Sequence, residues 1–65
     1  MRIQVNGEVR DVAAATLAAL LCELGYDDGA VATALNRNFV RKRDRSLAEI
    51  AEGDEIEIVV PRQGG

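Results

Sequence analysis

The chain has no histidine and no tryptophan, and it contains one cysteine, one proline and two aromatic residues, Tyr26 and Phe39. Protein zinc sites are built mainly from cysteine and histidine, and catalysis by a serine or cysteine nucleophile usually relies on a neighbouring histidine. Neither kind of site can be built from this composition. We therefore expect a protein that holds no metal and is not an enzyme.

Disulfides, membrane spans and a basic overall charge are also lacking. Cys22 has no second cysteine to pair with, which agrees with a reducing compartment. No apolar run approaches the roughly 20 residues that cross a bilayer, and no signal peptide precedes the first apolar stretch. The net charge of −3 argues against nucleic-acid binding. We expect a cytoplasmic protein that binds neither membranes nor nucleic acids.

A β-hairpin is predicted at the start of the chain. Residues 1–5 alternate between apolar and polar side chains, which is typical of a half-buried strand. Asn6-Gly7 follows and favours a type I′ turn, because both residues tolerate positive φ. Residues 8–12 are then the predicted return strand.

A short helix is predicted over residues 17–24. Thr16 is a candidate N-cap, and Gly25 stands where a glycine commonly closes a helix. The apolar positions recur at helical spacing and give one stripe, formed by Leu17, Leu20, Leu21 and Leu24. Because two turns are too short to persist alone in water, we expect this stripe to pack on the sheet.

The middle of the chain reads as two strands and a connection. Residues 30–35 are predicted to form a largely buried strand, 36–38 a turn and 39–40 a short strand, followed by a basic loop over 41–45. Ser46 and Glu49 have the spacing of a capping box, which predicts one helical turn with Leu47 and Ile50 directed inward.

The last predicted strand covers residues 55–60, after a turn at 52–54, and Pro61 ends it because proline cannot donate a backbone hydrogen bond. Its alternation places one set of side chains in the core, Ile56, Ile58 and Val60, and the other set, Glu55 and Glu57, in water.

These elements predict an α+β fold. The first and last strands are the most apolar, so we expect them side by side in the centre of the sheet. As a parallel pair they need a long crossover, which the helix-containing middle supplies. The arrangement is the ubiquitin-like β-grasp, a mixed sheet wrapped on one main helix. Residues 1–60 are predicted to form this domain, and residues 61–65 a flexible tail that ends in Gly64-Gly65.

Several segments carry a family resemblance: residues 3–8 (IQVNGE), 20–25 (LLCELG), Ala34-Leu35-Asn36 followed by Val40, 53–59 (GDEIEIV) and the closing Gly64-Gly65. Together they resemble the ThiS family of thiamine-biosynthesis sulfur carriers, which is related to the MoaD-type small subunit of molybdopterin synthase. The similarity covers essentially the whole chain. Arg37 departs from the pattern, because such proteins commonly have glycine there, and this leaves the type of that turn open.

The resemblance implies a protein on which other enzymes act. A ubiquitin-activating-like adenylyltransferase of the ThiF type would use ATP and magnesium to convert the Gly65 carboxylate to an acyl-adenylate. Sulfur from a cysteine desulfurase would then replace AMP, and thiazole synthase of the ThiG type would take that sulfur from the resulting thiocarboxylate. The chain itself would bind no cofactor.

The tail residues suit this chemistry. Gly64 and Gly65 have no side chains, so they can enter a narrow channel and leave the acyl carbon open to attack. Residues 61–65 reach at most about 17 Å, which allows the body to dock outside a buried nucleotide. Arg62 and Gln63 are candidates for recognition by the partner, but they fit the role of spacer equally well.

Three other features have two interpretations each. Phe39 and Val59 are candidates for an apolar docking patch, but Phe39 could equally fill the core. Residues 37–45 hold five basic groups and one acidic group, and residues 49–57 hold five acidic groups and no basic one. This asymmetry either steers partner enzymes or is a solvated loop beside an acidic turn. Cys22 lies off the leucine stripe, and we expect an inert thiol rather than a redox group.

Other functions stay open besides thiazole formation. A carrier for molybdopterin or another pathway would use the same tail, and a ubiquitin-like modifier would be joined through Gly65 to protein lysines. A β-grasp interaction module with an incidental Gly-Gly is the remaining alternative.

Overall fold

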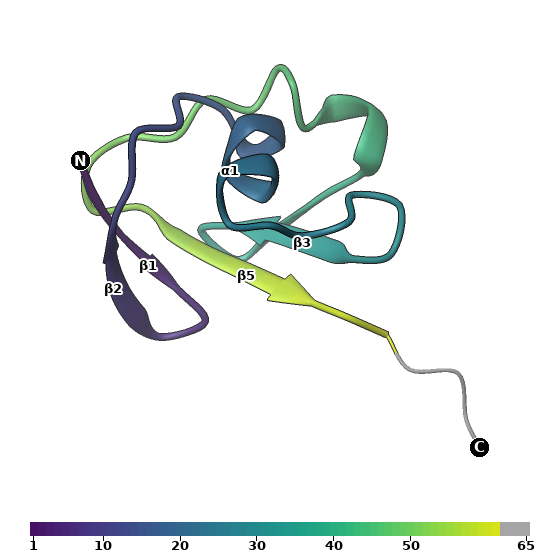
Figure 1. Ribbon diagram of the computed structural model, residues 1–65, viewed down its shortest axis with the longest axis horizontal. Coiled ribbons are helices and arrows are strands. Elements are labelled where there is room, and N and C mark those ends of the chain that lie inside the picture. The colour runs from purple at the N-terminus through teal and green to yellow at the C-terminus, as the bar shows by residue number, and fades with distance from the viewer. Residues whose placement is uncertain (62–65) are drawn as a thin grey trace.

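The computed structural model describes residues 1–61 of the chain. In chain order its elements are β1 (Arg2–Val5), β2 (Glu8–Asp11), α1 (Leu17–Glu23), β3 (Ala32–Leu35), β4 (Asn38–Val40), the 3-10 helix η1 (Lys42–Asp44) and β5 (Glu55–Val59). The strands form one sheet in the order β2-β1-β5-β3-β4, in which β1 and β5 are parallel and the other neighbours are antiparallel. Helix α1 lies across one face of this sheet (Figure 1). The predicted α+β fold, with a mixed sheet on one helix and a central parallel pair, is confirmed.

The hairpin and the helix form for the reasons that the sequence indicates. Asn6 and Gly7 have φ of 52° and 85°, and they join β1 to β2 through a tight turn. The Thr16 side chain caps α1 by accepting a hydrogen bond from the Ala19 N–H at 3.2 Å. At the other end Gly25, with φ of 81°, lets the chain reverse, and the Tyr26 N–H donates to the Leu21 carbonyl at 2.9 Å.

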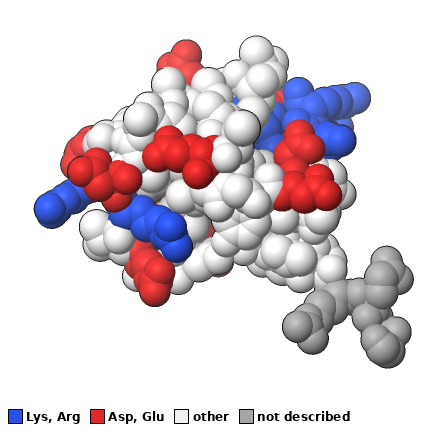
Figure 2. Space-filling view, in the orientation of Figure 1, with Lys and Arg blue, Asp and Glu red and all other residues white. Residues whose placement is uncertain are grey.

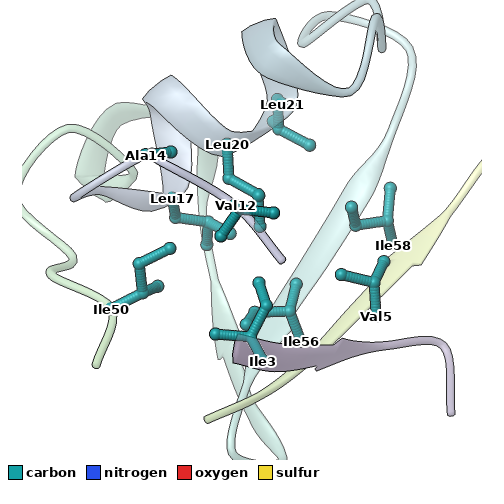
Figure 3. Close-up of a cluster of buried hydrophobic side chains, with 10 residues drawn as sticks. All are labelled: Ile3, Val5, Val12, Ala14, Leu17, Leu20, Leu21, Ile50, Ile56 and Ile58. Carbon is teal, nitrogen blue, oxygen red and sulfur yellow. The ribbon is translucent and has the colours of Figure 1, made fainter. Parts of the chain in front are cut away.

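The core lies between α1 and the sheet (Figure 3). Leu17, Leu20 and Leu21 are almost completely buried and face the strands, as predicted. Besides these three leucines, the core cluster contains side chains from the strands and loops: Ile3, Val5, Val12, Ala14, Ile50, Ile56 and Ile58. β1 and β5 thus contribute alternate residues to a single core on one side of the sheet.

The predicted helical turn at residues 46–49 is wrong. The helical segment is η1, which lies earlier, and Leu47 is 79% exposed rather than directed inward. Residues 48–50 run in an extended conformation beside residues 15–17, because the Leu17 N–H donates to the Ala48 carbonyl and the Ile50 N–H donates to the Ala15 carbonyl. Extended backbone places alternate residues on one side, so Ala48 is partly buried and Ile50 is buried as expected, whereas Leu47 lies in the preceding turn and is exposed.

The strand boundaries differ from the prediction at a few positions. β3 begins at Ala32 rather than at residue 30, because the Ala30 N–H donates to the Asp27 carbonyl and closes a turn. Asn38 pairs with Leu35 in β4 instead of lying in the turn. Val60 is 55% exposed rather than buried, because it lies beyond Val59, the last paired residue of β5.

The predicted boundary between a body of residues 1–60 and a tail of residues 61–65 falls at the limit of what the structure describes, and it stays a prediction. Within residues 1–61, no helix is long and apolar enough to cross a membrane.

Candidate functional site

The carboxyl end of β5 leads directly to the predicted tail. β5 is the central strand, paired with β1 on one side and with β3 on the other. Its last pairing joins Val59 to Ala32, and Val60 and Pro61 then continue away from the sheet (Figure 1). The predicted tail residues Arg62, Gln63, Gly64 and Gly65 lie outside the described part of the chain.

The Asn6 side chain holds the carboxyl end of β5. The Asn6 N–H, one residue past the end of β1, donates to the Ile56 carbonyl of β5 at 2.9 Å. Two residues further along β5, the Asn6 side chain makes the contacts instead of backbone. Its Nδ2 donates to the Ile58 carbonyl at 3.0 Å, and its Oδ1 accepts from the Ile58 N–H at 2.8 Å. We call this two-bond contact the Asn6 clasp.

Asn36 makes a similar contact at the other end of the same strand. Its Oδ1 accepts from the Glu55 N–H at 2.9 Å, and its Nδ2 donates to the Asp54 carboxylate at 3.1 Å. Asn36 and Arg37 have φ of 50° and 72°, so the turn between β3 and β4 has the same left-handed form as the Asn6-Gly7 turn. The departure at Arg37 therefore leaves the turn type unchanged, although arginine is strained in this conformation.

The face of the sheet opposite α1 carries the two candidate docking residues. Phe39 is 73% exposed and Val59 is 57% exposed, so the surface position of Phe39 is the one observed. The strand register brings Phe39 opposite Ala34, and Val59 opposite Ala32. These four residues, together with Thr33 and Glu57, line a shallow groove of about 200 Å³. We call Phe39, Val59, Ala32 and Ala34 the open-face patch.

The basic residues of segment 37–45 and the acidic residues of β5 are exposed as predicted, except for Arg45. Lys and Arg side chains gather over η1, at the upper right of Figure 2. Arg37, Arg41, Lys42 and Arg43 are exposed, whereas Arg45 from the predicted basic loop is buried, with 3% of its surface accessible. The acidic side of β5 shows Glu55 and Glu57 to solvent, as predicted.

The buried Arg45 guanidinium is a structural feature that the sequence did not reveal. Its Nε donates to the Thr33 hydroxyl at 3.0 Å, and its two terminal nitrogens donate to the Asp28 carbonyl at 2.6 Å and to the Val31 carbonyl at 2.8 Å. The Thr33 hydroxyl in turn donates to the Val40 carbonyl at 2.8 Å. Since Arg45 follows three other basic residues and one acidic residue, no local pattern distinguished it from its exposed neighbours.

Cys22 is an exposed free thiol on α1, beside a surface depression lined also by Ala18, Tyr26, Asp27 and Asp28. Nothing around it assigns a role. Among residues 1–61, no three histidine, cysteine, aspartate or glutamate side chains are grouped so that they could hold a metal ion.

One family model and two solved structures are similar to this chain over all or nearly all of its length. The model of the ThiS family matches residues 3–65. A crystal structure of a thiamine biosynthesis protein (ThiS) from Geobacter metallireducens is 25% identical, with a TM-score of 0.85 and full coverage of both chains. A solution structure of a thiamine biosynthesis protein from the same organism has a TM-score of 0.81 at 25% identity, and covers all of this chain and 88% of the other.

A curated relative of a different size is also similar. A thiazole synthase from Paramagnetospirillum magneticum is 39% identical over 66 residues, which cover all of this chain. The chain spans 20% of the length of that relative. The structural matches confirm the predicted ubiquitin-like β-grasp fold, and the family match covers nearly every residue, including Gly64 and Gly65. The chain therefore belongs to the ThiS family.

Proposed function

We propose that the chain is a sulfur carrier for thiamine biosynthesis, and that its Gly65 carboxylate is adenylated and then converted to a thiocarboxylate. Membership of the ThiS family and the similarity to a thiazole synthase both support a carrier role in this pathway. The observation that carries the proposal is the extent of the family match, which runs through the terminal Gly-Gly. The chain is then a substrate of other enzymes and not an enzyme itself.

The chemistry follows from the low reactivity of a carboxylate, whose negative charge repels nucleophiles and whose oxygen is a poor leaving group. In the first step a Gly65 carboxylate oxygen attacks the α-phosphorus of ATP and pyrophosphate leaves. In the second, the outer sulfur of a persulfide, formed when the desulfurase takes sulfur from cysteine, attacks the acyl carbon and AMP leaves. A thiol then attacks the inner sulfur of the resulting acyl disulfide, which releases the Gly65 thiocarboxylate, leaves a disulfide behind and supplies the two electrons that this step needs. The absence of a side chain on Gly65 lets the terminus enter a narrow channel for the first step and keeps the acyl carbon accessible in the second.

Three partners are part of the proposal. An adenylyltransferase of the ThiF type uses ATP and magnesium to activate the carboxylate, a cysteine desulfurase supplies sulfur, and a thiazole synthase of the ThiG type consumes the thiocarboxylate. The thiazole synthase from Paramagnetospirillum magneticum supports the last of these, because a fifth of its length resembles this chain. Gly64, Gln63 and Arg62 are the residues that we propose for recognition of the tail.

We propose the open-face patch as the docking surface on the body. Phe39 and Val59 are large exposed apolar side chains on the uncovered face, and the patch lies on β3, β4 and β5, the last of which leads to the tail. A partner that covers this patch would bury apolar surface, which favours association by about 25 cal/mol per Å² before the costs of binding are subtracted. The exposed basic residues near η1 would add electrostatic steering.

The intact mass of the chain, purified from cells that express it and grow without thiamine, tests the proposed chemistry. A fraction of the protein should carry one sulfur in place of one oxygen, and tandem mass spectrometry should place the change at Gly65. A variant that lacks Gly64 and Gly65 is the control, and it should show no such species.

Other results would point to the alternatives. Isopeptide-linked adducts between Gly65 and lysines would identify a protein modifier. A thiocarboxylate that appears equally in cells without thiazole synthase, and that does not support thiazole formation in a reconstituted reaction, would indicate another sulfur-requiring pathway. If no modified species forms and trimming the two glycines leaves function intact, the carrier proposal is wrong.

A further inference from the structure

Asn6 lies in the turn between β1 and β2, and its side chain hydrogen-bonds to the central strand β5. Strand β1 ends at Val5. The N–H and the carbonyl of Ile58 in β5 point to the side on which β1 lies, but they have no β1 backbone opposite them. The Asn6 carboxamide meets both groups, with one donor and one acceptor at 3.0 and 2.8 Å. Its side chain thus replaces the next residue that β1 would have contributed to the ladder.

We infer that Asn6 is a positioning residue, which fixes the carboxyl end of β5 and with it the point and direction at which the tail leaves the body. The inference rests on the proposed function, because only a tail that a partner must seat needs a fixed origin. Val59 is held on the opposite side by its pairing with Ala32, so the Asn6 clasp and this pairing together are the last attachments of β5 before Pro61.

The requirements of the clasp select asparagine. The position has φ of 52°, a left-handed conformation that asparagine adopts more readily than most residues. A carboxamide also offers a donor and an acceptor side by side, as a peptide group does, whereas a carboxylate offers acceptors only. Aspartate would therefore keep the turn and the bond from the Ile58 N–H, but it would place an oxygen against the Ile58 carbonyl.

Loss of the clasp should affect binding of the tail rather than the chemical step. Without it, β5 is held near Ile58 from the β3 side alone, and the partner must order part of the strand when it seats the tail. We expect KM for the carrier to rise about tenfold, the equivalent of ordering roughly one more residue on binding. The turnover number should stay unchanged, because the seated carboxylate is in the same place.

Asn36 provides a matched control within the same strand. It also has positive φ and makes two side-chain hydrogen bonds next to β5, but at the amino end of the strand, away from the tail. Asn6→Gly and Asn36→Gly each remove the carboxamide and keep a residue that accepts positive φ. The two variants should lose comparable thermal stability, and only Asn6→Gly should raise KM for the carrier.

The experiment measures ATP–pyrophosphate exchange by a purified ThiF-type adenylyltransferase as a function of carrier concentration, for the wild-type chain and both variants. Amide hydrogen exchange, followed by NMR, is measured on the same three proteins without the partner. Asn6→Gly should raise KM and accelerate exchange at Ile58, whereas Asn36→Gly should accelerate exchange at Glu55 and leave KM unchanged. If Asn6→Gly does not fold, Asn6→Asp replaces it. Because aspartate keeps the bond from the Ile58 N–H and loses only the donor to the Ile58 carbonyl, it should raise KM by less and accelerate exchange at Ile58 only slightly.

The possible failures are distinguishable. If the wild-type chain supports no pyrophosphate exchange, the proposed function fails, and the inference that rests on it fails as well. If the wild-type chain is activated and Asn6→Gly has the same KM, the positioning role alone is refuted. Equal increases in KM for both glycine variants would also refute it, because the effect would then reflect general loosening of β5.

Discussion

Replacement of Arg45 is predicted to cost this small domain a large part of its stability. A domain of this size has a free energy of unfolding of roughly 3–10 kcal/mol. Arg45 donates three hydrogen bonds from a buried guanidinium, and hydrogen bonds to charged groups contribute about 1.5–3 kcal/mol each. Burial of the charge costs several kcal/mol and offsets part of this sum. We expect Arg45→Ala to lower the free energy of unfolding by about 3 kcal/mol, since it also leaves the Asp28 and Val31 carbonyls without their partner.

Arg43→Ala is the matched control, because Arg43 is exposed in the same basic segment and should change stability by less than about 0.5 kcal/mol. Urea unfolding followed by far-ultraviolet circular dichroism measures both variants, and equal slopes against urea would show that the same surface unfolds. Arg45→Met keeps most of the apolar stem and removes the donors. If Arg45→Ala is as stable as Arg43→Ala, the buried network contributes nothing and the reasoning is wrong. If Arg45→Met matches the wild type, packing of the stem is what stabilises the segment.

Four further changes test other parts of the molecule. Gly65→Ala should slow adenylation about tenfold or more, because a Cβ hinders entry of the terminus into a narrow channel, and leave the thermal midpoint unchanged; equal pyrophosphate exchange would contradict this. Arg37→Gly should raise the free energy of unfolding by about 0.5–1 kcal/mol, because glycine relieves the strain at φ of 72° and the exposed Arg37–Glu55 ion pair at 3.7 Å contributes little; an unchanged urea midpoint would argue against strain. Phe39→Ser should weaken binding to the adenylyltransferase in calorimetry, whereas Val9→Ser, an exposed apolar residue near the other edge of the same face, should not; equal losses would remove the open-face patch from the binding surface. The association rate with the adenylyltransferase should fall as salt rises if the basic residues steer it, and a rate independent of salt would leave only a solvated loop.

The sequence predicts the elements that depend on neighbouring residues. Asn6-Gly7 fixes a tight turn through its backbone preferences alone, and Thr16 and Gly25 mark both ends of a helix whose leucines all face one way. The pairing of β1 with β5 was also within reach, because the two most apolar strands favour the centre of a sheet and the helix-containing middle is long enough for the crossover of a parallel pair. The turns and the helix ends therefore follow from neighbouring residues, and the central strand pair follows from which strands are most apolar.

The prediction fails where a distant contact decides the local structure. The Ser46–Glu49 spacing suits a helix start, yet residues 48–50 are held in an extended form by backbone bonds to residues 15–17, more than 30 positions away. Arg45 is drawn under β3 by acceptors at positions 28, 31 and 33, which no window around residue 45 contains. The role of the Asn6 side chain is missed for the same reason, since its partner Ile58 lies 52 positions along the chain.

One strand carries both the anchor of the tail and part of the surface that we propose for docking. Because a single short helix covers only one face of the sheet, alternation along β5 sends Ile56 and Ile58 into the core and leaves Glu57 and Val59 on the uncovered face. Ordering a tail costs about 1–2 kcal/mol for each residue, so contacts made by the tail must first offset that cost. Contacts made by Val59 carry no such cost, since its backbone is already fixed by the pairing with Ala32. A partner that binds the open-face patch therefore gains affinity from a rigid surface, and it holds the origin of the tail at a defined distance from its own active site.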